Sequence, residues 1–167
     1  MKNIILTGFM GSGKTEVGKR LAQRLGYAFL DTDKLIEEKT GKSISEIFRE
    51  EGESSFRELE TEVIKNLSGI TGYIISTGGG IVIREENILS LKNIGLVIWL
   101  KASPETIINR ISSGTHRPLL NVDNPLEQIK KLLSIREQFY SRADVSIDTD
   151  GLEVDEIVKV ILCLETL

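Results

Sequence analysis

The chain has 167 residues and a formal net charge of −4, with 40% hydrophobic, 28% charged and 5% aromatic residues. This length suits one domain rather than two, and the excess of acidic residues argues against a general nucleic-acid-binding surface, which would be basic. The single cysteine, Cys163, excludes a disulfide framework or a thiolate metal cluster within the chain, and we expect it to be a packing residue in an apolar helix of a protein from a reducing compartment.

Five short apolar runs are typical of strands that are buried on both faces of a sheet. They cover residues 3–6, 27–30, 73–76, 96–100 and 145–147. Helical patterns separate them, so the order of elements predicts an α/β fold with a mostly parallel sheet. The longest apolar run is far too short to cross a bilayer, and the N-terminal run lacks the length and cleavage site of a signal peptide. We therefore expect a cytoplasmic protein.

The first predicted strand leads directly into "GFMGSGKT", residues 8–15, which matches the phosphate-loop pattern G-x-x-x-x-G-K-[ST] in full. A predicted helix, 14–25, follows. The glycines allow backbone N–H groups to turn inward around phosphate oxygens, and the helix adds the positive end of its dipole. Lys14 can reach the β- and γ-phosphates, and Thr15 can offer its hydroxyl to Mg²⁺. The motif predicts a nucleoside triphosphate site but does not define the reaction.

Two acidic residues follow the second strand. "FLDTDK" places Asp31 and Asp33 at its carboxyl end, where ligands bind in open parallel sheets. One carboxylate could hold Mg²⁺ through water, and the other could accept the proton of an acceptor hydroxyl. The alternative is that one of them only caps the next helix, and capping does not exclude function.

The next helical region contains an arginine beside an apolar stripe. "SISE", residues 43–46, is a capping box, and a second helix is predicted at 53–67. Arg57 lies beside the apolar stripe of this helix, with Glu53 and Glu60 within helical reach. From the pattern alone, Arg57 is either an anion ligand or part of a surface ion pair that contributes little.

The third strand ends in "STGGG", residues 76–80, and carries no acid. Gly78, Gly79 and Gly80 remove three side chains at the carboxyl edge of the sheet. A polyhydroxylated ligand could then lie against main-chain N–H groups. A tight turn, which is the alternative, needs only one or two glycines. We therefore interpret the run as a place where a ligand approaches the backbone.

One segment, residues 112–124, reads as an extended loop, and the next helix begins at Asn124-Pro125. Long loops in compact domains often act as lids. Arg110 precedes the loop, and Arg117 within it could close over a transferring phosphate. Solvated surface positions are the alternative for these arginines.

A second cation falls on an apolar helix face. Arg136 is in register with Leu132, Leu133 and Tyr140. A cation on such a face is costly unless it has an anionic partner. The pattern therefore favours an anion-binding role for Arg136.

Taken together, the motifs resemble those of the shikimate kinases, in the family's order and spacing and over essentially the whole chain. The matching segments are "GFMGSGKT", "FLDTD", "SSFRELE", "STGGG", "HRPLL" and "IREQFY". The resemblance implies a three-layer α/β/α P-loop kinase with a five-stranded parallel sheet and a mobile lid. Residues 1–167 would form one domain, with acceptor-binding helices at about 33–61 and the lid at about 112–124. The implied reaction is transfer of the γ-phosphoryl group of ATP to the 3-hydroxyl of shikimate, in the biosynthesis of aromatic amino acids.

On the nucleotide side, the resemblance implies that Arg110 flanks the adenine and that Arg117 folds in with the lid to stabilise charge on the moving phosphoryl group. Mg²⁺ would be held by Thr15 and, through water, by Asp31. The residues implied to hold the phosphates are Gly11, Ser12, Gly13, Lys14 and Thr15, of which Lys14 would also be catalytic. The family often has a proline in the loop after the last strand, and "DTDGLEVD", residues 148–155, has none.

On the acceptor side, the resemblance implies that Asp33 binds the ring hydroxyls and assists deprotonation. Arg57 and Arg136 would clamp the shikimate carboxylate, while Gly79 and Gly80 would meet the ring hydroxyls. The implied partners are shikimate and ATP, without nucleic acid or membrane, and we expect a monomer.

Three alternatives differ in class or substrate. A gluconate or nucleoside monophosphate kinase would share the phosphate loop, and a gluconate kinase would also need a carboxylate clamp. A regulatory nucleotide switch usually shows the guanine-reading N-K-x-D motif, which this chain lacks. An inactive binding module is disfavoured because Lys14, Thr15, Asp31 and Asp33 are all present.

Overall fold

The computed structural model describes residues 2–112 and 123–164. Almost all of the predicted lid, including Arg117, therefore lies outside the described residues. Within the described ranges, no helix has the length and apolar character needed to cross a membrane.

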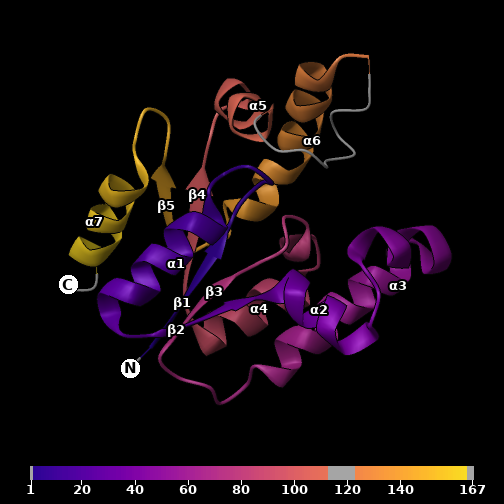
Figure 1. Ribbon diagram of the computed structural model, residues 1–167, viewed down its shortest axis with the longest axis horizontal. Coiled ribbons are helices and arrows are strands. Elements are labelled where there is room, and N and C mark those ends of the chain that lie inside the picture. Colours follow the sequence, from indigo (N-terminus) through magenta and orange to yellow (C-terminus); the bar gives the residue numbers. More distant parts are fainter. Residues whose placement is uncertain (1, 113–122, 165–167) are drawn as a thin grey trace.

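A five-stranded, fully parallel sheet forms the centre of the molecule, with the strand order β2-β3-β1-β4-β5 (Figure 1). Each predicted strand is confirmed, with small changes at the ends, but the prediction of burial on both faces is wrong for the two edge strands, β2 and β5, which are partly exposed. The strands are β1 (Asn3–Thr7), β2 (Ala28–Asp31), β3 (Tyr73–Ser76), β4 (Gly95–Lys101) and β5 (Val145–Asp148). Because β1 is central, the phosphate loop that follows it lies at the middle of the sheet's carboxyl edge.

Helices cover both faces of the sheet and give the predicted three layers (Figure 1). They are α1 (Lys14–Leu25), α2 (Thr32–Thr40), α3 (Ile44–Asn66), α4 (Glu85–Ile94), α5 (Pro104–Ser112), α6 (Pro125–Tyr140) and α7 (Val154–Leu164), with a 3₁₀ turn, η1, at Ile81–Ile83. One apolar cluster joins α1 and α7 to the sheet, and a second joins α3, α4, α5 and α6 to the opposite face.

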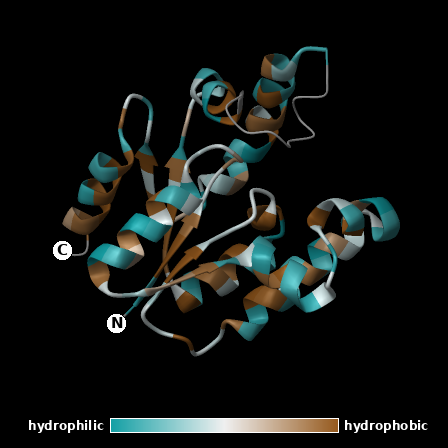
Figure 2. Ribbon diagram, viewed as in Figure 1, coloured by the Kyte–Doolittle hydropathy of each residue, from teal (hydrophilic) through white to brown (hydrophobic). Residues whose placement is uncertain are grey.

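The two clusters arise from the alternation of side chains along the strands. In β1, Ile4 and Leu6 belong to the cluster under α1 and α7, whereas Ile5 belongs to the other. All five residues of β1 are buried, as expected for a central parallel strand. Figure 2 shows the consequence: the strands are largely hydrophobic, and the helices turn their hydrophilic residues outward.

The two helices predicted between residues 43 and 67 are confirmed as the two halves of α3, which a non-helical residue at Gly52 separates. Ser43 begins α3 with the expected capping box: its hydroxyl accepts from the N–H of Glu46, whose carboxylate accepts from the N–H of Ser43 at 2.8 Å. The kink lies at Gly52, which has φ 82° and ψ 173°. Glycine adopts this positive φ without a steric penalty. The kink therefore redirects the second half of α3, which carries Arg57.

The prediction for Cys163 is wrong, because this residue is exposed. The buried stripe of α7 is formed by Ile157, Val158 and Ile161. Two residues beyond Ile161, a helix has turned by about 200°. Position 163 therefore faces away from the core, although its neighbours in the sequence are apolar.

Candidate active site

Two hollows meet at the phosphate loop on the carboxyl edge of the sheet. The larger, about 740 Å³, lies between α1, α5 and the segment after β5. The smaller, about 420 Å³, lies between the phosphate loop, the beginning of α2, both halves of α3, one residue of α6 and the loop after β3. Gly11, Lys14 and Thr15 line both. This arrangement suits two ligands that meet at the lysine.

The phosphate loop depends on glycine for its shape. Gly8, Gly11 and Gly13 all have positive φ, and a Cβ on Gly8 would lie 2.6 Å from the carbonyl oxygen of Leu100. Lys14 Nζ donates to the carbonyls of Gly8 and Phe9, at 2.8 and 2.9 Å. The ammonium group is therefore held inside the curve of the loop, where the N-terminus of α1 adds its positive potential.

Arg110 connects the phosphate loop to the segment after β5. Its guanidinium donates to the carbonyls of Ser12 and Thr149, at 3.3 and 3.0 Å, and to the Thr149 hydroxyl at 3.2 Å. It lines the larger hollow with Gly151 and Leu152. The planar guanidinium of Arg110 thus forms part of the wall of the larger hollow. It lies beside the segment 148–155, which contains no proline.

Thr15 and Asp31 form an oxygen-rich corner beside the phosphate loop. Thr15 Oγ1 donates to Asp31 Oδ2 at 3.5 Å, while Asp31 Oδ1 accepts from the N–H of Asp33 at 3.0 Å. Asp31 is therefore the N-cap of α2, and its second oxygen faces the phosphate loop. A hydroxyl and a carboxylate next to a phosphate site are the hard oxygen ligands that suit Mg²⁺.

Asp33 is held in the first turn of α2, at the wall of the smaller hollow. Its Oδ1 is buried and, among the described residues, has no hydrogen-bond partner. A Cβ on Gly78 would lie 2.5 Å from this oxygen, so the glycine makes room for the carboxylate. Burial, followed by the negative charge of Asp31, raises the pKa of Asp33 to about 6, against the opposing charges of Lys14 and Arg57.

Arg57 faces the smaller hollow and is oriented by two acids of its own helix. Its Nη1 donates to Glu60 Oε2 at 2.6 Å and its Nη2 to Glu53 Oε1 at 3.0 Å. The pair with Glu60 is not a surface pair, because the Arg57 side chain is only 12% exposed and that of Glu60 is 0% exposed. The pair with Glu53 reaches the surface, since the Glu53 side chain is 63% exposed. A Cβ on Gly80 would lie 2.7 Å from Arg57 Cζ, so the guanidinium lies directly on that glycine.

Glu60 also belongs to the site, although the sequence pattern predicted only that it could pair with Arg57. It lines the hollow, and its Oε1 is buried without a hydrogen-bond partner among the described residues. Burial raises the pKa of Glu60 above its ordinary value, although the hydrogen bond and charge of Arg57 act in the opposite direction. A signal was present in the sequence: an acid three residues after Arg57, in line with the apolar positions Phe56 and Val63.

Arg136 approaches the same hollow from α6. Its Cζ lies 5.6 Å from the centre of the Phe9 ring, and it lines the hollow with Asp33, Arg57 and Gly79. The two arginines come from helices far apart in the chain, and the fold brings both to the acid and to the glycine corner. Arg117, predicted to act from the lid on the transferring phosphoryl group, lies outside the described residues.

The glycine corner, residues 78–80, lines the hollow with main-chain groups alone. Among the described residues, no hydrogen-bond acceptor is found for the N–H groups of Gly79 and Gly80. The other polar groups of the corner are satisfied. Thr32 Oγ1 accepts from the N–H of Gly78 at 2.9 Å, Ile81 and Ile83 donate to the carbonyls of Gly78 and Gly80 at 3.2 and 3.1 Å, and the Tyr140 hydroxyl donates to the carbonyl of Gly79.

The parallel sheet, the phosphate loop and the adjoining polar hollow define a P-loop kinase that acts on a small molecule. Comparison with known proteins identifies its family. The shikimate kinase family model matches residues 10–164, and the chain belongs to the shikimate kinase family.

Relatives and solved structures agree with this assignment. The shikimate kinase of Thermodesulfovibrio yellowstonii is 49% identical over 162 residues, which cover 97% of this chain and 94% of the relative. That of Geobacter sulfurreducens is 50% identical over 157 residues, covering 94% and 87%. The structure of shikimate kinase from Acinetobacter baumannii in complex with shikimate matches with a TM-score of 0.92 at 40% identity, covering 99% and 93%. The predicted α/β P-loop kinase fold and the prediction of an ATP-dependent shikimate kinase are confirmed.

Proposed function

We propose that this chain transfers the γ-phosphoryl group of ATP to the 3-hydroxyl of shikimate, giving shikimate 3-phosphate and ADP, through the residues that line the two hollows. The observation that carries the proposal is the smaller hollow. It combines two arginines, an acid with a raised pKa and two backbone donors beside the phosphate-loop lysine. We also expect a cytoplasmic monomer that acts without nucleic acid or a membrane surface.

The larger hollow is proposed to hold ATP. The backbone N–H groups from Gly11 to Thr15, including that of Ser12, and the Lys14 ammonium surround the phosphates, and Arg110 flanks the adenine on the α5 side. Thr15 and, through water, Asp31 are proposed to hold Mg²⁺. When bound, this ion would neutralise phosphate charge and help to orient the terminal phosphoryl group.

The smaller hollow is proposed to hold shikimate. Arg57 and Arg136 pair with its carboxylate, since a guanidinium can donate two parallel hydrogen bonds to such a group. The N–H groups of Gly79 and Gly80 and the carboxylate of Asp33 bind the ring hydroxyls. The complex of the Acinetobacter baumannii relative with shikimate supports this choice of acceptor.

The chemical step requires a proton acceptor and stabilisation of negative charge. Asp33 accepts the proton of the attacking hydroxyl, because its unpaired buried oxygen is available and a pKa of about 6 suits a base near neutral pH. The positive charge of Lys14 stabilises the negative charge that spreads over the phosphoryl oxygens. Arg117 is proposed from the sequence to add a second cation from the lid.

The proposal is tested by measuring ADP release with ATP and Mg²⁺ in parallel reactions with shikimate, gluconate or AMP. We expect stimulation by shikimate alone, at a rate well above the background hydrolysis of ATP without an acceptor. The product should be identified by ³¹P NMR as a phosphate ester at the 3-position. Stimulation by gluconate or AMP without stimulation by shikimate would overturn the proposal.

A further inference from the structure

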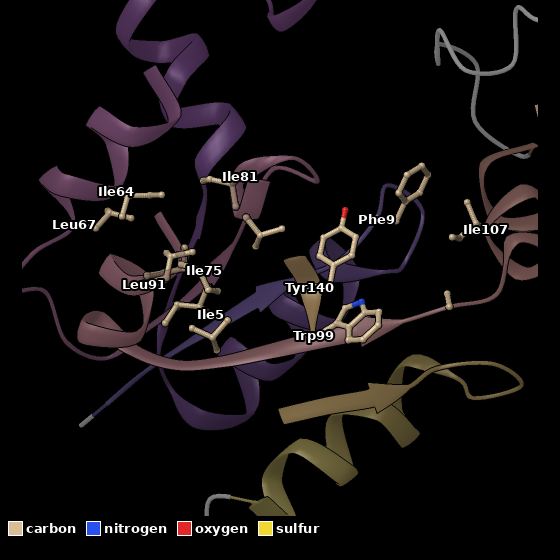
Figure 3. Close-up of a cluster of buried hydrophobic side chains, with 14 of the residues drawn as sticks. Ile5, Phe9, Ile64, Leu67, Ile75, Ile81, Leu91, Trp99, Ile107 and Tyr140 are labelled. Atoms are coloured by element: carbon tan, nitrogen blue, oxygen red, sulfur yellow. The ribbon is translucent and has the colours of Figure 1, made fainter. Parts of the chain in front are cut away.

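Tyr140 connects the glycine corner to the core of the protein. It is the last residue of α6 and is fully buried. Its ring stacks on Trp99 of β4, with the ring centres 5.7 Å apart and the planes at 21°. Figure 3 shows the hydroxyl pointing away from the indole. That hydroxyl donates to the carbonyl of Gly79, 61 residues away in the sequence. The packing of the ring therefore fixes the position of the donor.

This hydrogen bond determines the orientation of one peptide group. The carbonyl of Gly79 and the N–H of Gly80 belong to the same planar unit, which is trans because the described chain has no cis peptide bonds. In a trans peptide, the C=O and the N–H point in opposite directions. With the oxygen held on the side of the core, the N–H of Gly80 points toward the hollow that both glycines line.

Glycine makes such an anchor necessary. A peptide between two glycines can rotate at little steric cost, because neither residue has a Cβ. Rotation by half a turn would place a carbonyl oxygen in the hollow, where it would face Asp33 and Glu60. A hydroxylated ligand would then meet a third acceptor in place of a donor. The N–H of Gly80 therefore faces the hollow only if a hydrogen bond holds the carbonyl of Gly79 on the side of the core.

We propose that Tyr140 is a positioning residue for the acceptor, whose hydroxyl holds the Gly79–Gly80 peptide so that the N–H of Gly80 faces the ring hydroxyls of shikimate. The inference rests on the proposed acceptor site. Tyr140 does not itself line the hollow and acts through the glycine.

Two further observations agree with this role. Burial raises the pKa of Tyr140 to about 12, against the charge and hydrogen bond of Arg136, so the phenol remains a donor throughout the working pH range. The charge of Arg136, which lines the hollow, also acts on this phenol. Tyr140 is therefore electrostatically coupled to the proposed carboxylate-binding part of the site.

The test is Tyr140→Phe, which removes the hydroxyl and keeps the ring on Trp99. We expect the Kd for shikimate to rise about tenfold, as for the loss of one well-oriented hydrogen bond, while the Kd for ADP stays within about twofold. The matched control is Tyr73→Phe at the start of β3, at the opposite edge of the sheet, which should change neither constant. Equal losses for shikimate and ADP would indicate a purely structural role and overturn the inference.

A second measurement follows the amide group of Gly80 directly in the wild-type protein. With ¹⁵N-glycine labelling, the amide proton of Gly80 should move downfield and exchange more slowly with solvent when shikimate is added. In Tyr140→Phe, its resonance should shift or broaden before ligand is added and should respond less to shikimate. A Gly80 amide that does not respond to shikimate in the wild type would overturn the inference, even if the variant failed to fold. Failure of the wild type to bind shikimate would instead overturn the proposed function.

Discussion

Replacing Asp33 with asparagine should inactivate the enzyme and make the protein more stable at neutral pH. The folded protein holds this carboxylate in a buried position beside Asp31 and leaves Oδ1 without a hydrogen-bond partner among the described residues. The charged form is therefore less favourable in the folded chain than in the unfolded one. The Asp33→Asn substitution would retain the shape of the side chain and remove the charge.

The magnitude follows from the pKa. An increase from the ordinary value of 3.8 to about 6 is about 2 pKa units, and each unit corresponds to about 1.4 kcal/mol. Because the pKa is raised on folding, protonated Asp33 favours the folded state, and this contribution is lost as the pH rises from about 4 through 6. At pH 7.5, the Asp33→Asn protein should be more stable than the wild type by roughly 2–3 kcal/mol, or about 5–10 °C in Tm. Below pH 4, the difference should vanish.

The assay is urea unfolding of both proteins between pH 3.5 and 8, followed by circular dichroism. The matched control is Glu38→Gln, which makes the same carboxylate-to-amide change at an exposed position of α2 and should change stability by less than about 0.5 kcal/mol. A stability difference that is absent at pH 7.5, or that does not vary with pH, would refute the view that Asp33 is a strained buried charge.

Three other perturbations probe the same site. For wild-type turnover, kcat/KM for shikimate should fall about tenfold per pH unit below about pH 6, as Asp33 becomes protonated; a flat profile down to pH 5 would remove its role as proton acceptor. Arg136→Ala should weaken shikimate binding about 10- to 100-fold and leave ADP binding nearly unchanged by calorimetry, so equal losses for both ligands would contradict the carboxylate clamp. Gly80→Ala should fold normally, because Gly80 has φ −106°, but its Cβ must displace the Arg57 guanidinium; the KM for shikimate should rise about tenfold, and an unchanged KM would argue against the observed packing of these two residues.

The sequence was sufficient for those features that local patterns determine. A central parallel strand buried on both faces is apolar throughout, so β4 could be predicted from the run at 96–100. The edge strands β2 and β5 are partly exposed but also contain short apolar runs. The phosphate loop was predictable because only glycine adopts the required backbone angles without strain. The capping box at Ser43 was predictable because both of its hydrogen bonds join residues three positions apart.

Patterns on single helices left other features open. Periodicity placed Cys163 among apolar neighbours, but the side of α7 that becomes buried depends on which of its residues meet the sheet. Likewise, Arg57 with Glu53 and Glu60 had the appearance of a surface pair. Only the packing of α3 against the site shows that Arg57 and Glu60 are buried and that the guanidinium lies against Gly80.

The tertiary structure alone decided how distant segments combine. The pKa of Asp33 depends on its burial and on charged neighbours from three segments of the chain. No local sequence pattern can predict the combined effect. The hydrogen bond from Tyr140 to Gly79 joins residues 61 positions apart. The sequence determines which groups are available for chemistry through local sterics and hydrophobic periodicity, whereas their exposure, charge and direction depend on contacts that exist only after the sheet and its helices have packed.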